Sequence, residues 1–148
     1  MKKTEIESVI TENFLCRIAF RGNDYPYIAP FQYVFANGML YFHFTAYGRK
    51  MKLLEKESRV CVEIEQYEPD MRRYRFVVLT GTLSIVKDAN ERAAVIDMMR
   101  ETGTERLSKN FLAAHGFPKA EDWTSFTPDK PLAIVKLNVA SVSGLRSP

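Results

Sequence analysis

Cysteine, histidine and tryptophan are scarce in this chain of 148 residues, which contains two cysteines, two histidines and one tryptophan. Cys16 and Cys61 stand alone in apolar surroundings, no C-x-x-C pair occurs, and His43 and His115 lie far from both cysteines in the sequence. A structural zinc site needs four converging ligands, so we expect no metal site. The pattern predicts two buried, reduced thiols that behave as small hydrophobic side chains in a reducing compartment.

Long apolar runs, targeting signals and a strong charge bias are also missing. No run approaches the roughly 20 residues that cross a bilayer, and Met1–Glu5 lacks the apolar core of a signal peptide. We therefore expect a cytoplasmic protein that contacts no membrane. The net charge of +3, from 21 basic and 18 acidic residues, is too small to indicate a nucleic-acid binder.

Low-complexity sequence and the common catalytic signatures are absent as well. Seven glycines and seven prolines are too few for a disordered or collagen-like chain, and the length fits a single domain spanning residues 1–148. The chain contains no G-x-S-x-G, G-x-x-x-x-G-K-[ST], H-E-x-x-H or G-x-G-x-x-G sequence. Because strong acid pairs are also missing, a hydrolase is not expected.

Aromatic and β-branched runs are what the sequence does have, and they predict strands. Tyr27–Phe35 and Met39–Thr45 flank an Asn37-Gly38 pair, and both residues of that pair tolerate positive φ. This is the strongest short-range signal for a β-hairpin. Pro30 cannot donate to a β-ladder, so we expect it at a strand edge or a bulge.

The remaining elements follow from hydrophobic periodicity and from capping residues. Alternating segments predict four more strands, and segments with helical spacing predict helices between them. Strands that are not regularly interleaved with helices indicate a mainly β fold, an antiparallel six-stranded barrel with short peripheral helices. The predicted strands are 14–20, 60–66, 75–86 (with a bulge at Gly81) and 132–142, and the helices are 4–13 (capped by Thr4 and Glu7), 49–56, 88–102 and 105–115.

The segment from His43 to Lys50 carries the clearest chemical signal. It places Thr45 and Ala46 at the end of a strand, then Gly48, then Arg49 and Lys50 at the start of a helix. Backbone N–H groups at a helix start, a hydroxyl and two cations suit a terminal phosphate. Alternatively, the two cations simply begin a solvent-exposed helix, although cations in a first turn oppose the helix dipole.

The order of these segments resembles that of the pyridoxamine 5'-phosphate oxidase-like FMN-binding split-barrel family. Within that family, the chain is most similar to the branch that contains nitroimidazole-resistance-type proteins. The similarity extends from Leu15 to Gly144, and the stretches that carry it are Pro26–Val34, Gly38–His43, Thr45–Lys50, Val60–Ile64, Tyr74–Gly81 and Val142–Gly144.

The resemblance implies a homodimer with FMN in grooves between two subunits. One group of residues is then expected along the edge of the flavin ring, partly through the backbone. A second group is expected beside the ribityl chain, and a third around the phosphate. In this order the groups are Pro30, Phe31, Gln32 and Tyr33; His43, Thr45 and Ala46; and Gly48, Arg49 and Lys50.

Some positions depart from the family pattern. Phe76 stands where a small polar residue is common, so a hydrogen bond to the ring from that position is in doubt unless Arg75 compensates. The C-terminal segment with which true pyridoxamine phosphate oxidases bind substrate has no counterpart near 141–148, so that reaction is not expected. Trp123 either covers a flavin or anchors an irregular loop, and His115 is expected to have no chemical role.

Three functional interpretations remain open. The first is an FMN-dependent oxidoreductase that reduces a small electrophile, such as a nitro compound, quinone or flavin, with NAD(P)H as a possible donor. No catalytic side chain is needed, because the flavin carries the electrons. The second is a non-enzymatic flavin binder. The third is a deazaflavin or haem binder, in which His43 would become the candidate haem ligand.

Overall fold

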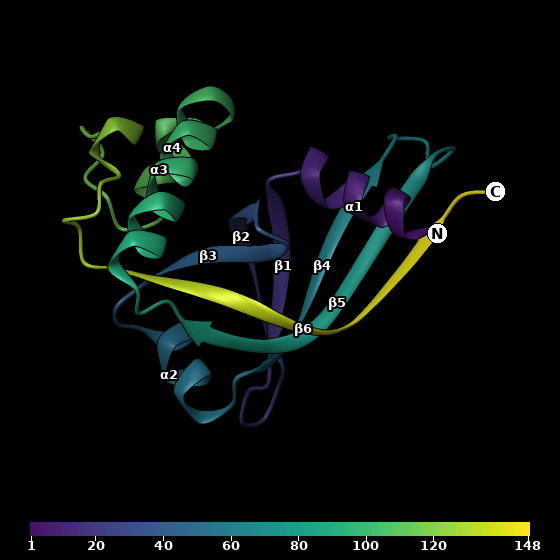
Figure 1. Cartoon of the computed structure of the whole chain (residues 1–148), viewed down its shortest axis with the longest axis horizontal. Coiled ribbons are helices and arrows are strands. Elements are labelled where there is room, and N and C mark those ends of the chain that lie inside the picture. Colours follow the sequence, from purple (N-terminus) through teal and green to yellow (C-terminus); the bar gives the residue numbers. More distant parts are fainter.

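The computed structural model describes all 148 residues and is mainly β. Six antiparallel strands close into a barrel in the order β1–β2–β3–β6–β5–β4, as the resemblance implies (Figure 1). The strands are β1 (Leu15–Phe20), β2 (Tyr27–Ala36), β3 (Met39–Thr45), β4 (Arg59–Tyr67), β5 (Tyr74–Ile85) and β6 (Leu132–Arg146).

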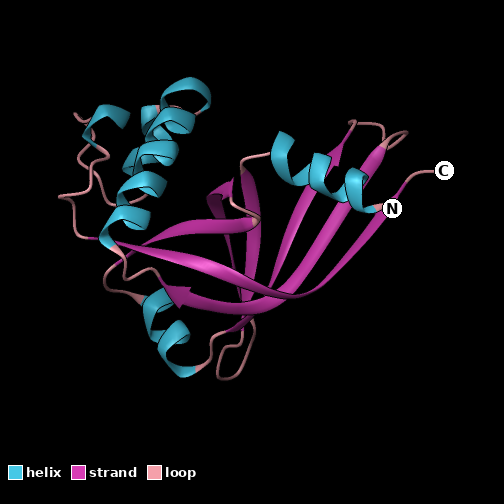
Figure 2. Ribbon diagram, in the orientation of Figure 1, coloured by secondary structure: helices cyan, strands magenta, loops and turns pink.

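The helices lie outside the barrel. Figure 2 shows α1 beside the long strands at one end, with α3 and α4 together at the other end. None of the helices is long and apolar enough to cross a bilayer. The helices are α1 (Lys3–Glu12), α2 (Arg49–Lys56), α3 (Ala89–Arg106) and α4 (Lys109–Ala113), followed by a short 3-10 turn, η1 (Trp123–Ser125).

Two helix predictions are wrong in their limits. Helix α1 begins before Thr4, because the backbone N–H of Lys2 donates to the Glu5 carboxylate at 2.6 Å and starts the helix there. The helix predicted over 105–115 is divided, because α3 continues to Arg106 and the Ser108 side chain caps a separate α4 of five residues.

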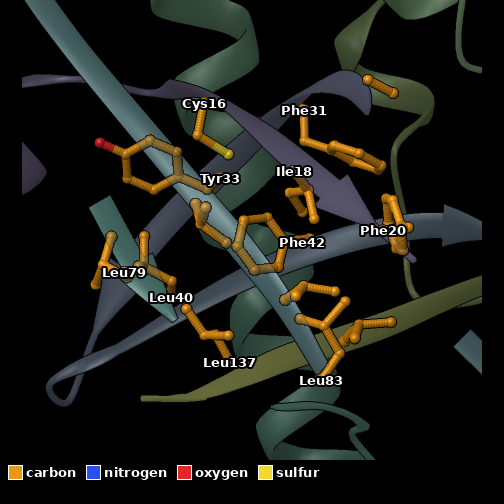
Figure 3. Close-up of a cluster of buried hydrophobic side chains, with 14 of the residues drawn as sticks. Cys16, Ile18, Phe20, Phe31, Tyr33, Leu40, Phe42, Leu79, Leu83 and Leu137 are labelled. Carbon is orange, nitrogen blue, oxygen red and sulfur yellow. The ribbon is translucent and has the colours of Figure 1, made fainter. Parts of the chain in front are cut away.

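The barrel interior is built from alternate residues of the strands. Cys16, Ile18 and Phe20 of β1 point inward, as the period-two pattern predicts, and pack with Phe31 and Phe42 (Figure 3). Cys61 lies on the opposite face of its strand and is exposed, so the prediction that both thiols are buried is wrong. Adjacent strand residues face opposite sides, and Val60 and Val62 take the inward positions.

A second core lies between the barrel and α3. Val95, Ile96 and Met99 of α3 pack on Tyr41 and Trp123. The Arg92 guanidinium donates to three carbonyl groups, two in the irregular segment 116–131 and one at the start of β6, and so ties this segment to α3. These carbonyl groups belong to Pro128, Lys130 and Leu132.

The predicted hairpin is confirmed, but its two strands soon diverge. Asn37 and Gly38 have φ values of 53° and 76°, as a two-residue turn of this kind requires. Only Tyr33–Ala36 of β2 pairs with Met39–Phe42 of β3. Beyond these pairs, β2 continues with β1 and β3 continues with β6. We call this divergence the split.

Pro30 lies on the side of the split where β2 has no second partner. It pairs with Arg17 of β1 and is exposed, so the expected edge position is confirmed. The expected irregularity at Gly81 is also present, because the β5–β6 register shifts between Thr80 and Gly81. A Cβ atom at Gly81 would lie 2.2 Å from the Asn138 carbonyl oxygen, so only glycine fits this close approach.

Candidate functional site

The connection from β3 to α2 forms a turn whose geometry depends on Gly48. Its φ of 102° and ψ of −175° lie in a region that is essentially restricted to glycine. The Thr45 hydroxyl donates to the Tyr47 carbonyl at 2.6 Å and holds the turn. No side chain caps α2, so the backbone N–H groups of its first turn stay available to an anion. Ala46 is exposed beside them.

Arg49 and Lys50 each lie on an aromatic ring of β2. The Arg49 guanidinium is 4.4 Å from the centre of the Tyr27 ring, and the Lys50 ammonium is 4.7 Å from the centre of the Phe31 ring. Partial burial lowers the pKa of Lys50. Because Phe31 belongs to β2 at the split, Lys50 brings a positive charge from α2 to the point where the two strands diverge.

Two buried polar atoms without hydrogen-bond partners lie at the same register position of the split. Gln32 and His43 are the residues directly beyond the last β2–β3 pair, Tyr33 with Phe42. The Gln32 amide donates to the Met99 carbonyl at 3.1 Å, but its Oε1 has no partner, and neither has Nε2 of His43. Buried polar atoms are nearly always paired, so this position is suited to a polar group from a ligand.

His43 contacts two rings from segments outside the barrel, Phe126 directly after η1 and His115 in the turn after α4. The ring centres of Phe126 and His115 are each 5.0 Å from that of His43. Burial above all, followed by the neighbouring His115 and Lys50, lowers the pKa of His43 to about 3. The side chain is therefore a neutral imidazole at physiological pH, with only 4% of it exposed.

His115 is the residue of this site that sequence analysis missed. Its Nδ1 lies 2.6 Å from the Phe111 carbonyl, which can only accept, so Nδ1 carries the proton and Nε2 is an acceptor in the neutral ring. Burial lowers the pKa of His115 as well. No local signal identifies this contact, because the turn that follows α4 reaches β3 only through the packing of the helical layer.

Two of the residues expected at a flavin ring are enclosed within the chain. Phe31 and Tyr33 point into the barrel core, with 2% and 1% exposed, and the Tyr33 hydroxyl donates to the Ile10 carbonyl at 2.7 Å. Burial raises the pKa of Tyr33, so it remains a neutral donor. Along this part of β2, the exposed Pro30 and the backbone face the open edge.

The departures at Arg75 and Phe76 have structural explanations. Phe76 stacks on Tyr74, with ring centres 5.2 Å apart. Arg75 points to the other face, where it pairs with Glu12 of α1 at 2.9 Å, so it does not replace a polar group at position 76. Trp123 is buried, donates to the Ser108 carbonyl at 3.2 Å, and anchors the segment 116–131.

Comparison with known proteins identifies the family to which this chain belongs. The sequence profile described as pyridoxamine 5'-phosphate oxidase matches residues 2–131, which is most of the chain. The chain belongs to this family. An uncharacterized protein of Rhizobium meliloti is 30% identical over 81 residues, which cover 55% of this chain and 52% of that protein. The chain thus matches about half the length of this curated relative.

Solved structures show the same fold at low sequence identity. An FAD-binding protein of Mesorhizobium loti is 18% identical, with a TM-score of 0.74 over 100% of this chain and 96% of the other. A proposed 5-nitroimidazole antibiotic resistance protein of Bacteroides thetaiotaomicron is also 18% identical, with a TM-score of 0.70 over 97% of this chain and 82% of the other. This family member therefore has the split barrel that its sequence implies.

Proposed function

We propose that this protein binds FMN at the split and acts as an FMN-dependent oxidoreductase. The observation that carries the proposal is the convergence of three features. These are an uncapped helix start behind Gly48, the cations Arg49 and Lys50, and two buried polar atoms without partners. A phosphate followed by a chain of hydroxyl groups matches this order of groups.

The residues present fit the two polar parts of FMN. The phosphate would lie at the start of α2, held by backbone N–H groups, by Arg49 and Lys50, and beside Thr45 and Ala46. A ribityl hydroxyl can donate to Gln32 Oε1 or His43 Nε2, the atoms that the chain leaves without partners. To reach these two atoms, the ribityl chain would enter between β2 and β3. The turn that carries His115 contacts His43 there.

The ring would lie beyond the split, along the edge of β2 at Pro30. Bound FMN supplies the electron transfer, and this chain supplies binding and the surroundings of the ring. Neutral His43 adds no charge at this position. No side chain has to act as an acid or base, and the substrate class we propose is a small electrophile such as a nitro compound or quinone, with NAD(P)H as electron donor.

We further propose that two copies form the complete site. The outer face of the sheet exposes apolar residues from four strands, which is typical of a surface that is covered by another chain. Arg17 lies among them and pairs with Glu63 at 3.4 Å and with Glu65. The exposed apolar residues are Leu15 (40% exposed), Ile28 (61%), Val78 (37%) and Leu145 (61%).

The visible spectrum of the purified protein, before and after addition of FMN, tests the proposal. We expect a flavin spectrum that is lost in the double variant Arg49→Ala/Lys50→Ala and retained in Lys3→Ala/Lys87→Ala. The control removes the same charge from exposed sites outside the split. A protein that fails to bind FMN, or an Arg49/Lys50 variant that keeps it, would contradict the proposed site.

Reduction and reoxidation of the bound flavin distinguish an enzyme from a passive flavin binder. A passive binder needs no open face on the flavin ring. We expect NAD(P)H to bleach the bound flavin and a nitroaromatic compound or quinone to restore its colour. A flavin that is bound but not reduced by NAD(P)H would favour the passive binder.

A further inference from the structure

Helix α2 concentrates the positive charge of the chain. Its eight residues include four cations and one acid, a net charge of +3, which equals the net charge of the whole chain. The cations are Arg49, Lys50, Lys52 and Lys56, and none has a carboxylate within 4.0 Å, although many other cations of the chain do.

This arrangement is unfavourable in an isolated chain. Arg49 and Lys50 place positive charge in the first turn, where the helix dipole favours negative charge. Lys52 and Lys56 are four residues apart on one helix face, where like charges repel. A single phosphate at the start of α2 offsets the first effect but lies away from Lys56, almost two turns along the helix.

A groove beside α2 collects the cations that the phosphate site does not use. Arg49, Lys52 and Lys56 follow one another along one side of α2 and line this groove together with Tyr25 and Asp24 of the loop between β1 and β2. The groove has a volume of about 310 Å³, which lies within the range of small-ligand sites. Three cations against one acid make it a site for an anion.

Arg49 connects the groove to the phosphate site. Lys50 turns toward Phe31 at the split, whereas Arg49 lines the groove and also belongs to the first turn of α2. An anion bound at the start of α2 is therefore next to a cation that lines the groove and to a cation that contacts Phe31 at the split. A chemical group bound in the groove would be linked to the flavin through the phosphate of the flavin.

Tyr25 supplies a flat apolar surface in the same groove. It is 81% exposed, the largest exposure among the large hydrophobic side chains of the chain. An exposed aromatic ring beside lysines is the usual combination for binding a nucleotide, because a base stacks on the ring and the cations hold the phosphate.

We propose that the groove beside α2 holds the adenosine phosphate half of FAD, so that this protein prefers FAD to FMN. The inference rests on the proposed function, because FAD contains the FMN unit assigned to the split. A nicotinamide dinucleotide fits this groove less well, since its nicotinamide must reach the flavin ring, at the opposite end of FMN from the phosphate.

Calorimetric titration of the flavin-free protein with FMN, with FAD, and with FMN in the presence of AMP tests this inference. We expect FAD to bind at least about tenfold more tightly than FMN, a gain typical of one stacked base with added phosphate contacts. AMP supplied separately should not reproduce the gain.

Variants of the groove locate the effect. Lys52→Ala/Lys56→Ala should bring the Kd of FAD close to that of FMN and leave the Kd of FMN within about twofold. Lys3→Ala/Lys87→Ala, with the same loss of charge, should retain the preference; α1, which carries Lys3, lies at the other end of the molecule from α2 (Figure 1). Tyr25→Ala should weaken FAD binding, whereas Tyr25→Phe keeps the stacking surface and should retain it.

The outcomes separate the two proposals. Equal affinity for FAD and FMN, or a preference that survives Lys52→Ala/Lys56→Ala, would overturn the groove and leave FMN binding at the split intact. Tight binding of FMN only when AMP is added would identify a separate nucleotide site and would also overturn it. Failure to bind either flavin would remove both proposals.

Discussion

His43 and His115, the only two histidines of the chain, lie with their ring centres 5.0 Å apart. His43 comes from β3 and His115 from the turn after α4, so the contact joins the barrel to the helical layer. Burial lowers the pKa of both rings, and the Lys50 ammonium adds a smaller effect in the same direction. Both histidines are therefore neutral, although they lie near the start of α2, which is suited to a phosphate.

Replacing His43 should separate stability from ligand binding. In His43→Leu the unpartnered buried nitrogen is lost, so we expect the free energy of unfolding without ligand to rise by about 1–2 kcal/mol. The affinity for flavin should fall about tenfold, because a hydrogen-bond partner disappears. Denaturant unfolding and calorimetric titration measure the two effects, and a variant that is both less stable and unchanged in affinity would contradict the assignment.

The stability of the protein should decrease as the pH falls below neutrality. The pKa of His43 is about 3 in the folded chain against an ordinary value of 6.5, so the unfolded chain binds a proton first. The contribution of His43 to the free energy of unfolding should therefore be constant above about pH 7 and fall by up to about 1.4 kcal/mol per pH unit between 6.5 and 3.

Unfolding measured at pH 7 and pH 5 in wild type and in His43→Leu isolates this contribution, because most carboxylates are ionised at both values. The variant should lose much of the pH dependence, and the part that remains is expected from His115. Identical pH dependence in the two proteins would show that His43 is accessible to protons in the folded chain.

Gly103 should resist substitution despite its position within a helix. A Cβ atom there would lie 2.1 Å from the Trp123 ring, which is buried. Alanine improves helix propensity by about 1 kcal/mol, but the clash costs more, so Gly103→Ala should destabilise the protein by about 1–3 kcal/mol. Thermal unfolding measures this loss. Thr104→Ala, at an exposed neighbouring position, should leave the stability nearly unchanged.

The outer face of the sheet provides a test of the homodimer. Leu145→Asp introduces a charge where the side chain is 61% exposed in one chain and would be covered by a second copy. We expect light scattering to show a dimer for wild type and a monomer for this variant. Ile85→Asp, which adds the same charge to an exposed position at the far end of β5, should remain a dimer. A monomeric wild type would contradict the proposal.

Local signals identified most of the fold and the phosphate end of the site. The Asn37-Gly38 turn, the alternation along β1 and the start of α2 after Gly48 depend on backbone preferences of a few adjacent residues, and each prediction is confirmed. Errors occur where two local signals compete, as at the start of α1, where Glu5 caps Lys2 before Thr4 can act.

The sequence by itself determined a six-stranded barrel with a cationic turn, because hydrophobic periodicity and turn residues act over short distances. Only the tertiary structure decided that His115 contacts His43, that Gln32 and His43 lack partners at one register position, and that Tyr25 lines one groove with cations of α2. These relationships join segments distant in the chain, and their geometry depends on how the barrel closes and on how the helices pack against it.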